Sequence, residues 1–198
     1  GKWALVGGAS KGLGFGCAQA LAREGVNVVM VARGAEALEA AAAKLRALKG
    51  PGGAPVTAIA LAADITTESG RAAIFALRKD FDILVTNAGG PPPGEFHEHA
   101  IEVWQRAINV NMLSAVEAVQ RVLPGMKAAR FGRIVNITSF VVKEPYPNMA
   151  LANSIRVGLT GAMSTLAREV AAHGITVNNI LPGLMDTGAL QRVIDARV

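Results

Sequence analysis

The feature that most constrains this chain is a series of short, continuous apolar runs in which polar and apolar residues do not alternate. A strand of this kind is buried on both faces, as in a parallel sheet that helices cover on either side. We predict such strands at Trp3–Val6, Val26–Val31, Val56–Leu61, Asp82–Thr86, Arg133–Thr138 and Ile175–Leu181. The pattern therefore predicts an α/β protein with a doubly wound parallel sheet in three layers.

The segments between these runs have the apolar spacing of amphipathic helices. Helices are expected at about Gly14–Arg23, 35–48, 66–77, Ile101–Ala129 and Ala152–Ala172. Thr66 or Thr67 is the expected N-cap of the third helix, and Pro124 is expected to kink the last turns of the fourth. The 198 residues contain no internal repeat and no linker, so we expect a single domain over residues 1–198.

Composition excludes several classes of function. The net charge is +5, but the basic residues are scattered and aromatic residues make up only 5%, so nucleic acid is not an expected partner. Charged residues interrupt every apolar stretch before it reaches the length of a membrane span. The single cysteine, Cys17, lies in an apolar helical segment and is expected to be a small buried hydrophobe. Without a disulfide, a membrane span or a leader pattern, the protein is expected in the cytoplasm.

The loop after the first strand has the sequence GGASKGLG, from Gly7 to Gly14, and a helix follows it. Glycines permit a tight turn and let backbone N–H groups approach a pyrophosphate at the helix N-terminus. The alternative is a turn selected only for its conformation. The candidate cofactor-binding residues of this loop are Gly8, Ser10, Lys11, Gly12, Leu13 and Gly14.

The second strand ends in Ala32-Arg33, where a protein that selects an unphosphorylated ribose would have an acid. A guanidinium suits a ribose 2′-phosphate, which it can hold with two parallel hydrogen bonds. Lys11 would add a second positive charge near the same phosphate. The sequence therefore predicts NADP(H) as the cofactor, the alternative being that Arg33 is only a surface residue.

The ends of the other strands carry further motifs, namely Ala63-Asp64-Ile65, Asn87-Ala88-Gly89, Ser139 and Pro182–Thr187. Together with GGASKGLG, GRIVNITS and AREVAAHGITVNNILPG, these motifs resemble the short-chain dehydrogenase/reductase family over almost the whole chain. Parts of the sequence are similar to bacterial 3-oxoacyl-acyl-carrier-protein reductases. The resemblance implies a Rossmann-type fold and an oxidoreductase that transfers a hydride between NADP(H) and a carbonyl or alcohol.

The resemblance also implies roles for individual residues. Asn111, in NVNML, would hold a water molecule, and Ser139 would hydrogen-bond the substrate oxygen. Asp64 would accept a hydrogen bond from the adenine amino group, with Ile65 packing beside it. The remaining implied cofactor contacts are Asn87, Ala88 and Gly89 near the adenine ribose, and Pro182, Gly183 and Thr187 around the nicotinamide and its phosphates.

The resemblance fails at two positions. Family members have a tyrosine thirteen residues after the active-site serine and a lysine four residues further on, where this chain has Ala152 and Arg156. Counting back from LAREV in the same helix gives the same two positions. Alanine has no proton to donate, whereas an arginine can hold the cofactor ribose and supply charge but relays protons poorly. The expected active site is therefore atypical, with Ser139, Asn111 and Arg156 as its catalytic residues.

The missing acid leaves two functions open. One is an NADP(H)-dependent oxidoreductase whose proton comes from water or an unassigned group, and the other is an NADP(H)-binding sensor or partner protein with little catalysis. Tyr146, the only tyrosine, is a candidate replacement acid, although packing in its proline-flanked loop is the expected role. His97 and His99 have the spacing of a ligand pair, but no further ligands are evident and no metal site is expected.

The expected partner is a small carbonyl or alcohol, whose identity and direction of reaction the sequence does not specify. The helix from Ala152 has apolar or small residues on several faces, and the resemblance implies pairing of subunits as a homodimer or homotetramer. Relatives continue past PGLMDTG into a helical substrate lid and a seventh strand. Residues Ala189–Val198 are therefore expected to form only the beginning of a lid.

Overall fold

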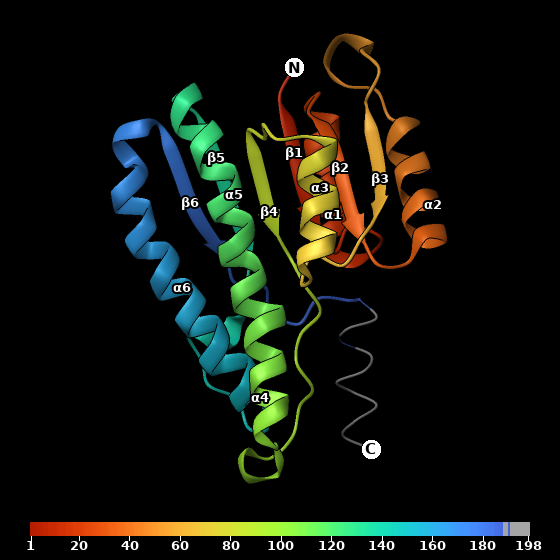
Figure 1. Cartoon of the computed structure of the whole chain (residues 1–198). Coiled ribbons are helices and arrows are strands. Elements are labelled where there is room, and N and C mark those ends of the chain that lie inside the picture. Colours follow the sequence, from red (N-terminus) through yellow and green to blue (C-terminus); the bar gives the residue numbers. More distant parts are fainter. Residues whose placement is uncertain (188–189, 191–198) are drawn as a thin grey trace.

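The computed structural model describes residues 1–187 and Leu190, and these form one parallel sheet between two layers of helices (Figure 1). The strand order is β3-β2-β1-β4-β5-β6, so the chain winds outward in both directions from β1. The strands are β1 (Trp3–Gly7), β2 (Asn27–Ala32), β3 (Ala58–Ala62), β4 (Ile83–Thr86), β5 (Gly132–Ile137) and β6 (Ile175–Ile180). The predicted doubly wound α/β fold is confirmed.

Each face of the sheet has its own core. On one face, α1 (Gly12–Arg23) and α2 (Ala35–Arg46) cover the strands, and their buried residues include Ala18 and Leu38. On the other face lie α3 (Glu68–Leu77), α5 (Ser114–Ala129) and α6 (Ala150–Val170), with Ile74, Val119 and Leu159 buried. The strands thus face apolar side chains on both sides, which accounts for their continuous apolar sequences.

The helix predicted at Ile101–Ala129 is divided. Its first part is α4 (Ile101–Ile108), a π-helical turn occupies Asn109–Leu113, and α5 follows. The break lies well before Pro124, and α5 continues through that proline to Ala129. Turns of the π type insert extra backbone into a helix and occur frequently at functional sites. The helix at α3 begins as predicted, because the Thr67 hydroxyl accepts a hydrogen bond from the N–H of Gly70 at 3.0 Å.

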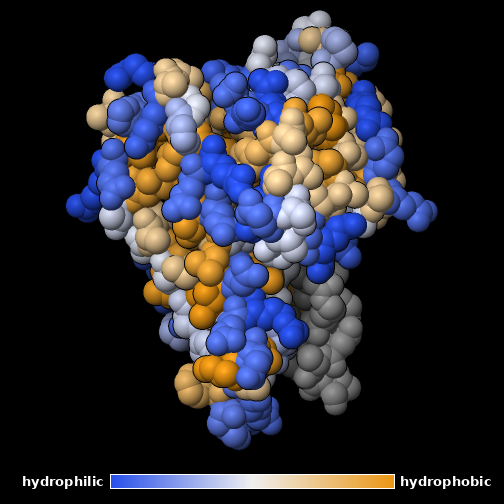
Figure 2. Space-filling model, viewed as in Figure 1, coloured by the Kyte–Doolittle hydropathy of each residue, from blue (hydrophilic) through white to orange (hydrophobic). Residues whose placement is uncertain are grey.

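Four short 3-10 turns complete the described secondary structure of residues 1–187: η1 (Pro51–Gly53), η2 (Phe96–Glu98), η4 (Phe140–Val142) and η5 (Ala171–His173). Apart from Leu190, the predicted lid at Ala189–Val198 lies outside the described residues. Among the described residues, no helix has both the length and the apolar character that a membrane crossing requires. Figure 2 shows apolar surface at the lower end of the molecule, around α4, where Phe96 and Ile101 are exposed.

Cys17 is partly buried in α1, in line with its expected packing role. Burial raises the pKa of its thiol, which disfavours the reactive thiolate.

Candidate active site

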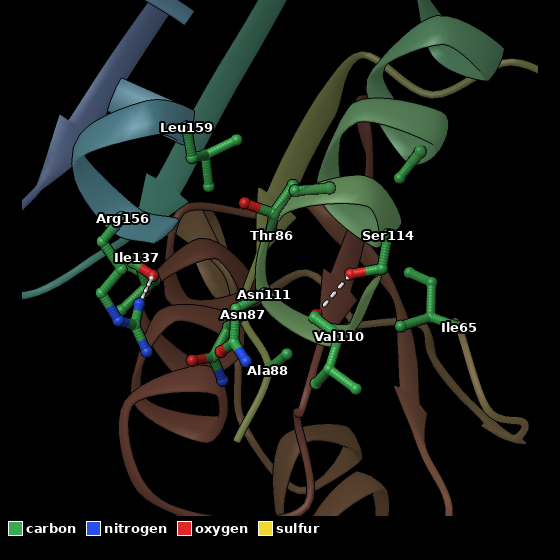
Figure 3. A pocket seen from close by; sticks show the side chains of 12 residues that line it. Ile65, Thr86, Asn87, Ala88, Val110, Asn111, Ser114, Ile137, Arg156 and Leu159 are labelled. Atoms are coloured by element: carbon green, nitrogen blue, oxygen red, sulfur yellow. Dashed lines mark hydrogen bonds between the residues drawn. The ribbon is translucent and has the colours of Figure 1, made fainter. Parts of the chain in front are cut away.

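A pocket lies where β4 and β5 end, at the edge of the sheet where doubly wound proteins bind ligands (Figure 3). It brings together five residues that the sequence assigned to the site, from four separate segments: Ile65, Asn87, Ala88, Asn111 and Arg156. The remaining lining residues are Thr86, Val110, Ser114, Ala115, Ala118, Ile137 and Leu159. The pocket wall is therefore mainly apolar, with a few polar groups directed into it.

Arg156, on α6, is the one cationic side chain among the described residues that line the pocket. One guanidinium nitrogen, Nη1, donates to the carbonyl oxygens of Ile137 at 3.1 Å and Thr138 at 2.9 Å. The guanidinium points toward the side of the pocket where Asn87 and Asn111 lie (Figure 3). Burial lowers the pKa of Arg156 from its ordinary value, but an arginine remains protonated in proteins. Among the described residues no acidic side chain lines the pocket, so this part of its wall carries a net positive charge.

Asn111 lies in the π-helical turn and is buried. Its side-chain nitrogen donates to the carbonyl oxygen of Ala107 at 3.3 Å. With the nitrogen held in this way, the amide oxygen is the acceptor that remains for another donor, such as a water molecule. Ser114 begins α5 on the same wall, and its hydroxyl donates to the carbonyl oxygen of Val110 at 2.7 Å.

Ser139 follows β5 and caps the short turn η4. Its hydroxyl oxygen accepts from the N–H of Val141 at 3.4 Å, a long hydrogen bond that leaves the hydroxyl proton available for another acceptor. The side-chain nitrogen of Asn153 donates to the carbonyl oxygen of Val141 and so ties the start of α6 to this turn. Neither Ser139 nor Ala152 is among the residues that line the pocket described above.

Ala152 lies one turn before Arg156 on α6 and is only 6% exposed. It has no group that could donate a proton. Tyr146, the candidate replacement acid, is exposed, and its ring packs edge-to-face on Phe140 with 6.2 Å between the ring centroids. This contact agrees with the packing role expected for Tyr146, and Phe140 follows Ser139 directly in the chain.

The glycine loop needs its glycines for close packing. Gly8 has a φ of 59°, and a β-carbon there would lie 2.6 Å from the side-chain nitrogen of Asn87. A β-carbon on Gly14 would collide with the carbonyl oxygen of Gly8. Asn87 donates from that nitrogen to the carbonyl of Gly7 at 3.3 Å, which joins the loops after β1 and β4. Helix α1 then starts at Gly12, and the side chain of its N-cap residue, Lys11, makes no capping hydrogen bond to the helix.

Two charged residues lie beyond β2 and β3. Arg33 is exposed directly after β2, and Asp64 is partly buried after β3. The Asp64 carboxylate accepts from the N–H and the hydroxyl of Thr66, at 3.0 and 2.8 Å. Partial burial raises the pKa of Asp64, but the Thr66 hydrogen bonds and the charge of Arg33 outweigh it, so the pKa lies below its usual range. Arg33 and Asp64 therefore belong to one electrostatic environment.

The segment after β6 closes against the same edge of the sheet. The carbonyl of Pro182 accepts from the N–H of Phe140 at 2.9 Å, and Gly183 next to it is exposed. The side chain of Thr187 would lie 3.7 Å from a β-carbon on Gly12, so this segment approaches the glycine loop. Ser10 is partly buried in that loop, Lys11 is exposed, Leu13 packs against the core beneath, and Gly89 is exposed after β4.

The sequence did not identify Thr86 and Ser114 as lining residues. Thr86 ends β4, and its hydroxyl donates to the side-chain oxygen of Asn136 at 2.7 Å. The side-chain nitrogen of Asn136 in turn donates to Asn179 at 3.1 Å. A threonine at a strand end and a serine in a helix have no distinctive pattern, so only the fold reveals their position. In the described part of the chain, no group of three or more potential ligands is placed to hold a metal ion.

Comparison with known proteins gives a consistent assignment. A family model described as short chain dehydrogenase matches residues 2–197. The uncharacterized oxidoreductase YxjF of Bacillus subtilis is 37% identical over 188 residues, which cover 93% of this chain and 71% of that protein. A 3-oxoacyl-[acyl-carrier-protein] reductase, FabG, of Staphylococcus epidermidis is 33% identical over 93% of this chain and 75% of its own length.

Among solved structures, YwfH superposes with a TM-score of 0.90 at 29% identity, over 98% of this chain and 77% of that one. It is described as an NADPH-dependent reductase involved in bacilysin biosynthesis.

Proposed function

The chain belongs to the short-chain dehydrogenase family, and we propose that it is an NADP(H)-dependent oxidoreductase that interconverts a carbonyl and an alcohol on a small molecule. The single observation that carries the proposal is the convergence of Asn87, Asn111 and Arg156 on one pocket at the carboxyl ends of β4 and β5. A protein that only bound a nucleotide would have no need of the buried amide of Asn111 there. The 3-oxoacyl reductases among its relatives make 3-oxoacyl thioesters one candidate class of substrate, beside simpler ketones.

The residues at the sheet edge suit a dinucleotide phosphate. The glycine loop turns tightly into α1, whose N-terminal N–H groups and dipole favour a pyrophosphate. Arg33 and Lys11 would hold the ribose 2′-phosphate, and Asp64 and Ile65 would receive the adenine. Gly89, Pro182, Gly183 and Thr187 would complete the contacts. The NADPH dependence of YwfH supports the same choice of cofactor.

The proposed mechanism assigns three tasks to the protein, one each to Ser139, Arg156 and Asn111. Bound NADP(H) supplies or accepts the hydride, which leaves the charge and the proton at the substrate oxygen to the protein. Ser139 donates a hydrogen bond to that oxygen. Arg156 places a fixed positive charge beside it, where negative charge develops during reduction, and a preorganised charge in a partly dry site is effective. Asn111 holds a water molecule, and the proton comes from water, because Ala152 has none to give.

A second function remains, because one observation favours it. Ala152 deprives the site of the family's acid, as expected for a cofactor-binding sensor or partner protein with little catalysis. The two functions separate when NADPH binding and NADPH oxidation are measured side by side with a panel of ketones, quinones and 3-oxoacyl thioesters. Turnover with any of them supports the enzyme, whereas tight binding without oxidation supports the sensor.

We also propose that the protein acts in the cytoplasm as a homodimer or homotetramer. Helix α6 buries Ile155, Leu159 and Met163 against its own subunit and leaves Val157 43% exposed. Ala162 is exposed as well, so apolar and small residues remain on the outer face of α6. A second copy of the chain is the partner that the family resemblance favours for this face.

A further inference from the structure

Arg71, on α3, is a buried cation that the proposed mechanism does not use. Only 6% of the residue is exposed, although arginine is among the residues least often buried in this way. It lies outside the pocket but contacts Ile65, which lines the pocket, and Glu117 of α5, the helix that carries other lining residues. A buried guanidinium is costly unless its position brings specific hydrogen bonds and charge pairs, so its contacts identify its task.

The first contact is with the loop that would receive the adenine. Nη1 of Arg71 donates to the carbonyl oxygen of Ile65 at 3.0 Å, and the Ile65 side chain lines the pocket. The second contact is with α5. The same nitrogen lies 2.7 Å from a carboxylate oxygen of Glu117. Glu117 lies on α5 between Ser114 and Ala118, and both of these line the pocket.

Arg71 therefore joins the Ile65 side of the pocket to the α5 side from behind. Glu68 adds a second carboxylate, 3.3 Å from Nη2 of Arg71, and it is itself held by Arg121 of α5 at 2.6 Å. Two ion pairs thus fasten the start of α3 to α5. If they were removed, the loop at 64–66 would lose its fixed distance from α5.

The packing next to Arg71 gives the same loop little freedom. A β-carbon on Gly70 would collide with the carbonyl oxygen of Asp64, so α3 approaches the loop as closely as glycine allows. The hydroxyl of Thr67 donates to that carbonyl oxygen at 2.9 Å. The backbone of Asp64 is thus held by Gly70 and Thr67, and that of Ile65 by Arg71.

We propose that Arg71 is a positioning residue for cofactor recognition: tied to Glu117, it holds Ile65 and Asp64 at the distance from α5 that an adenine ring requires. The proposal rests on the proposed function, because it presupposes that adenine binds there. Arg71 does not contact the cofactor. It acts through the carbonyl of Ile65 and so affects which base is accepted rather than how fast the hydride is transferred.

The test uses a ratio of two dissociation constants. NADPH is compared with reduced nicotinamide hypoxanthine dinucleotide phosphate, which has a carbonyl where adenine has the amino group that Asp64 would accept from. The unmodified protein should bind NADPH more tightly than the hypoxanthine analogue. Arg71→Met should reduce this preference by about tenfold, roughly the effect of one hydrogen bond to a charged group. A change that only destabilised the fold would weaken the binding of both ligands alike and leave the ratio of the two dissociation constants unchanged.

Arg46 offers a matched control on the opposite face of the sheet. Like Arg71, it contacts one carbonyl and one carboxylate, because it donates to the carbonyl oxygen of Ala58 at 2.9 Å and to the carboxylate of Glu39 at 2.7 Å. Arg46→Met should leave the ratio unchanged, and Arg71→Lys should retain part of the preference. If Arg71→Met does not fold, Glu117→Gln breaks the same tie from α5 with a milder change.

An unchanged ratio in folded Arg71→Met, or in Glu117→Gln, overturns the proposal. A protein that binds no NADPH would instead overturn the proposed function, and the inference with it.

Discussion

Ala152 and Arg156 lie one turn apart on α6, and Arg156 reaches the pocket while Ala152 is packed to 6% exposure without lining it. Residues four apart share a face of a helix. The same face of α6 therefore carries the charge of Arg156 and, at Ala152, no group that could act as an acid. Replacing these two residues therefore tests whether the chain is an enzyme with its own chemistry or a family member that has lost its acid.

The first prediction restores the family pair. Ala152→Tyr with Arg156→Lys should raise NADPH-dependent reduction of a reactive ketone by about 10²-fold, the low end for general acid catalysis. Because Ala152 is buried, the added ring should also lower the free energy of unfolding by about 1–3 kcal/mol. Steady-state rates and thermal melts measure the two effects. Ala152→Phe, which adds the ring without the hydroxyl, is the control and should give no gain in rate.

A slower double variant beside a fast unmodified enzyme would contradict this prediction. Ala152 would then provide space for a bulkier substrate, or for another acid such as Tyr146.

A second prediction concerns Ser139. Ser139→Ala should lower turnover by about tenfold or more, because one hydrogen bond to the reacting oxygen is lost, while NADPH affinity stays nearly constant. The long bond from Val141 contributes little, so the melting temperature should change only slightly. Ser164→Ala is a suitable control, since the Ser164 hydroxyl donates to the carbonyl oxygen of Thr160 within α6. Full activity in Ser139→Ala would reduce this serine to a structural cap of η4.

Cofactor choice provides the third prediction. Titrations should show tighter binding of NADPH than of NADH. Arg33→Ala should weaken the binding of NADPH by about tenfold and leave the binding of NADH unchanged, because a phosphate-binding guanidinium is lost. Arg23→Ala, at the exposed end of α1, should alter neither constant. Equal dissociation constants for the two cofactors in the unmodified protein would be incompatible with this role of Arg33.

The fourth prediction concerns stability in acid. Burial raises the pKa of Asp82, but Lys2, the N–H of Trp3 and Arg78 lower it more, so its pKa in the folded protein is below the usual range. The carboxylate accepts from Lys2 and from the N–H of Trp3, both at 2.8 Å. A depressed folded pKa contributes stability above the unfolded value of about 3.9. This contribution is lost as the pH falls through the lower folded pKa.

Asp82→Asn should therefore lower the free energy of unfolding by about 1 kcal/mol at pH 7 and flatten the acid decline. Denaturant titrations between neutral and acid pH measure both effects. A variant whose stability differs from the unmodified protein equally at every pH would show that Asp82 contributes by packing alone.

The fifth prediction tests self-association. Val157→Glu places a charge on the exposed apolar face of α6 and should shift the molecular mass in solution from a multiple of the 20.5 kDa chain toward the monomer. Ala40→Glu, on the exposed side of α2, is the matched control and should leave the mass unchanged. Light scattering after gel filtration gives the answer, and an unmodified protein that is already monomeric would refute the proposed assembly.

The strands could be predicted from the sequence because burial on both faces leaves a simple pattern. Val28 and Leu84 lie in such runs, and both are fully buried. Asn87 could be assigned to the site because loops at the carboxyl ends of parallel strands meet at one edge, whereas Arg156 was assigned from its place in the family's motif. Three features had no such signal. The π-helical turn at Asn109–Leu113 keeps an ordinary helical sequence, since only its hydrogen bonding differs.

Arg71 falls in a helix whose one other charged residue, Glu68, is exposed, and its burial depends on Glu117, 46 positions away along the chain. The packing of Ala152 depends on how α6 meets the turn after β5, which no local pattern records.

The π-helical turn also has a consequence for how this chain can vary. Successive residues of an α-helix are rotated by about 100° about its axis, so one inserted residue changes the phase of everything on one side of it. Before the turn, Trp104 and Val103 of α4 pack against Leu151 and Ile155 of α6. After it, Ser114 faces the pocket. Deleting a single residue here would restore regular α-helical hydrogen bonding. The same deletion would rotate either the α4 face away from α6 or the Ser114 face away from the pocket. The π-helical turn thus allows one continuous helical segment to pack against α6 before the turn and to line the pocket after it.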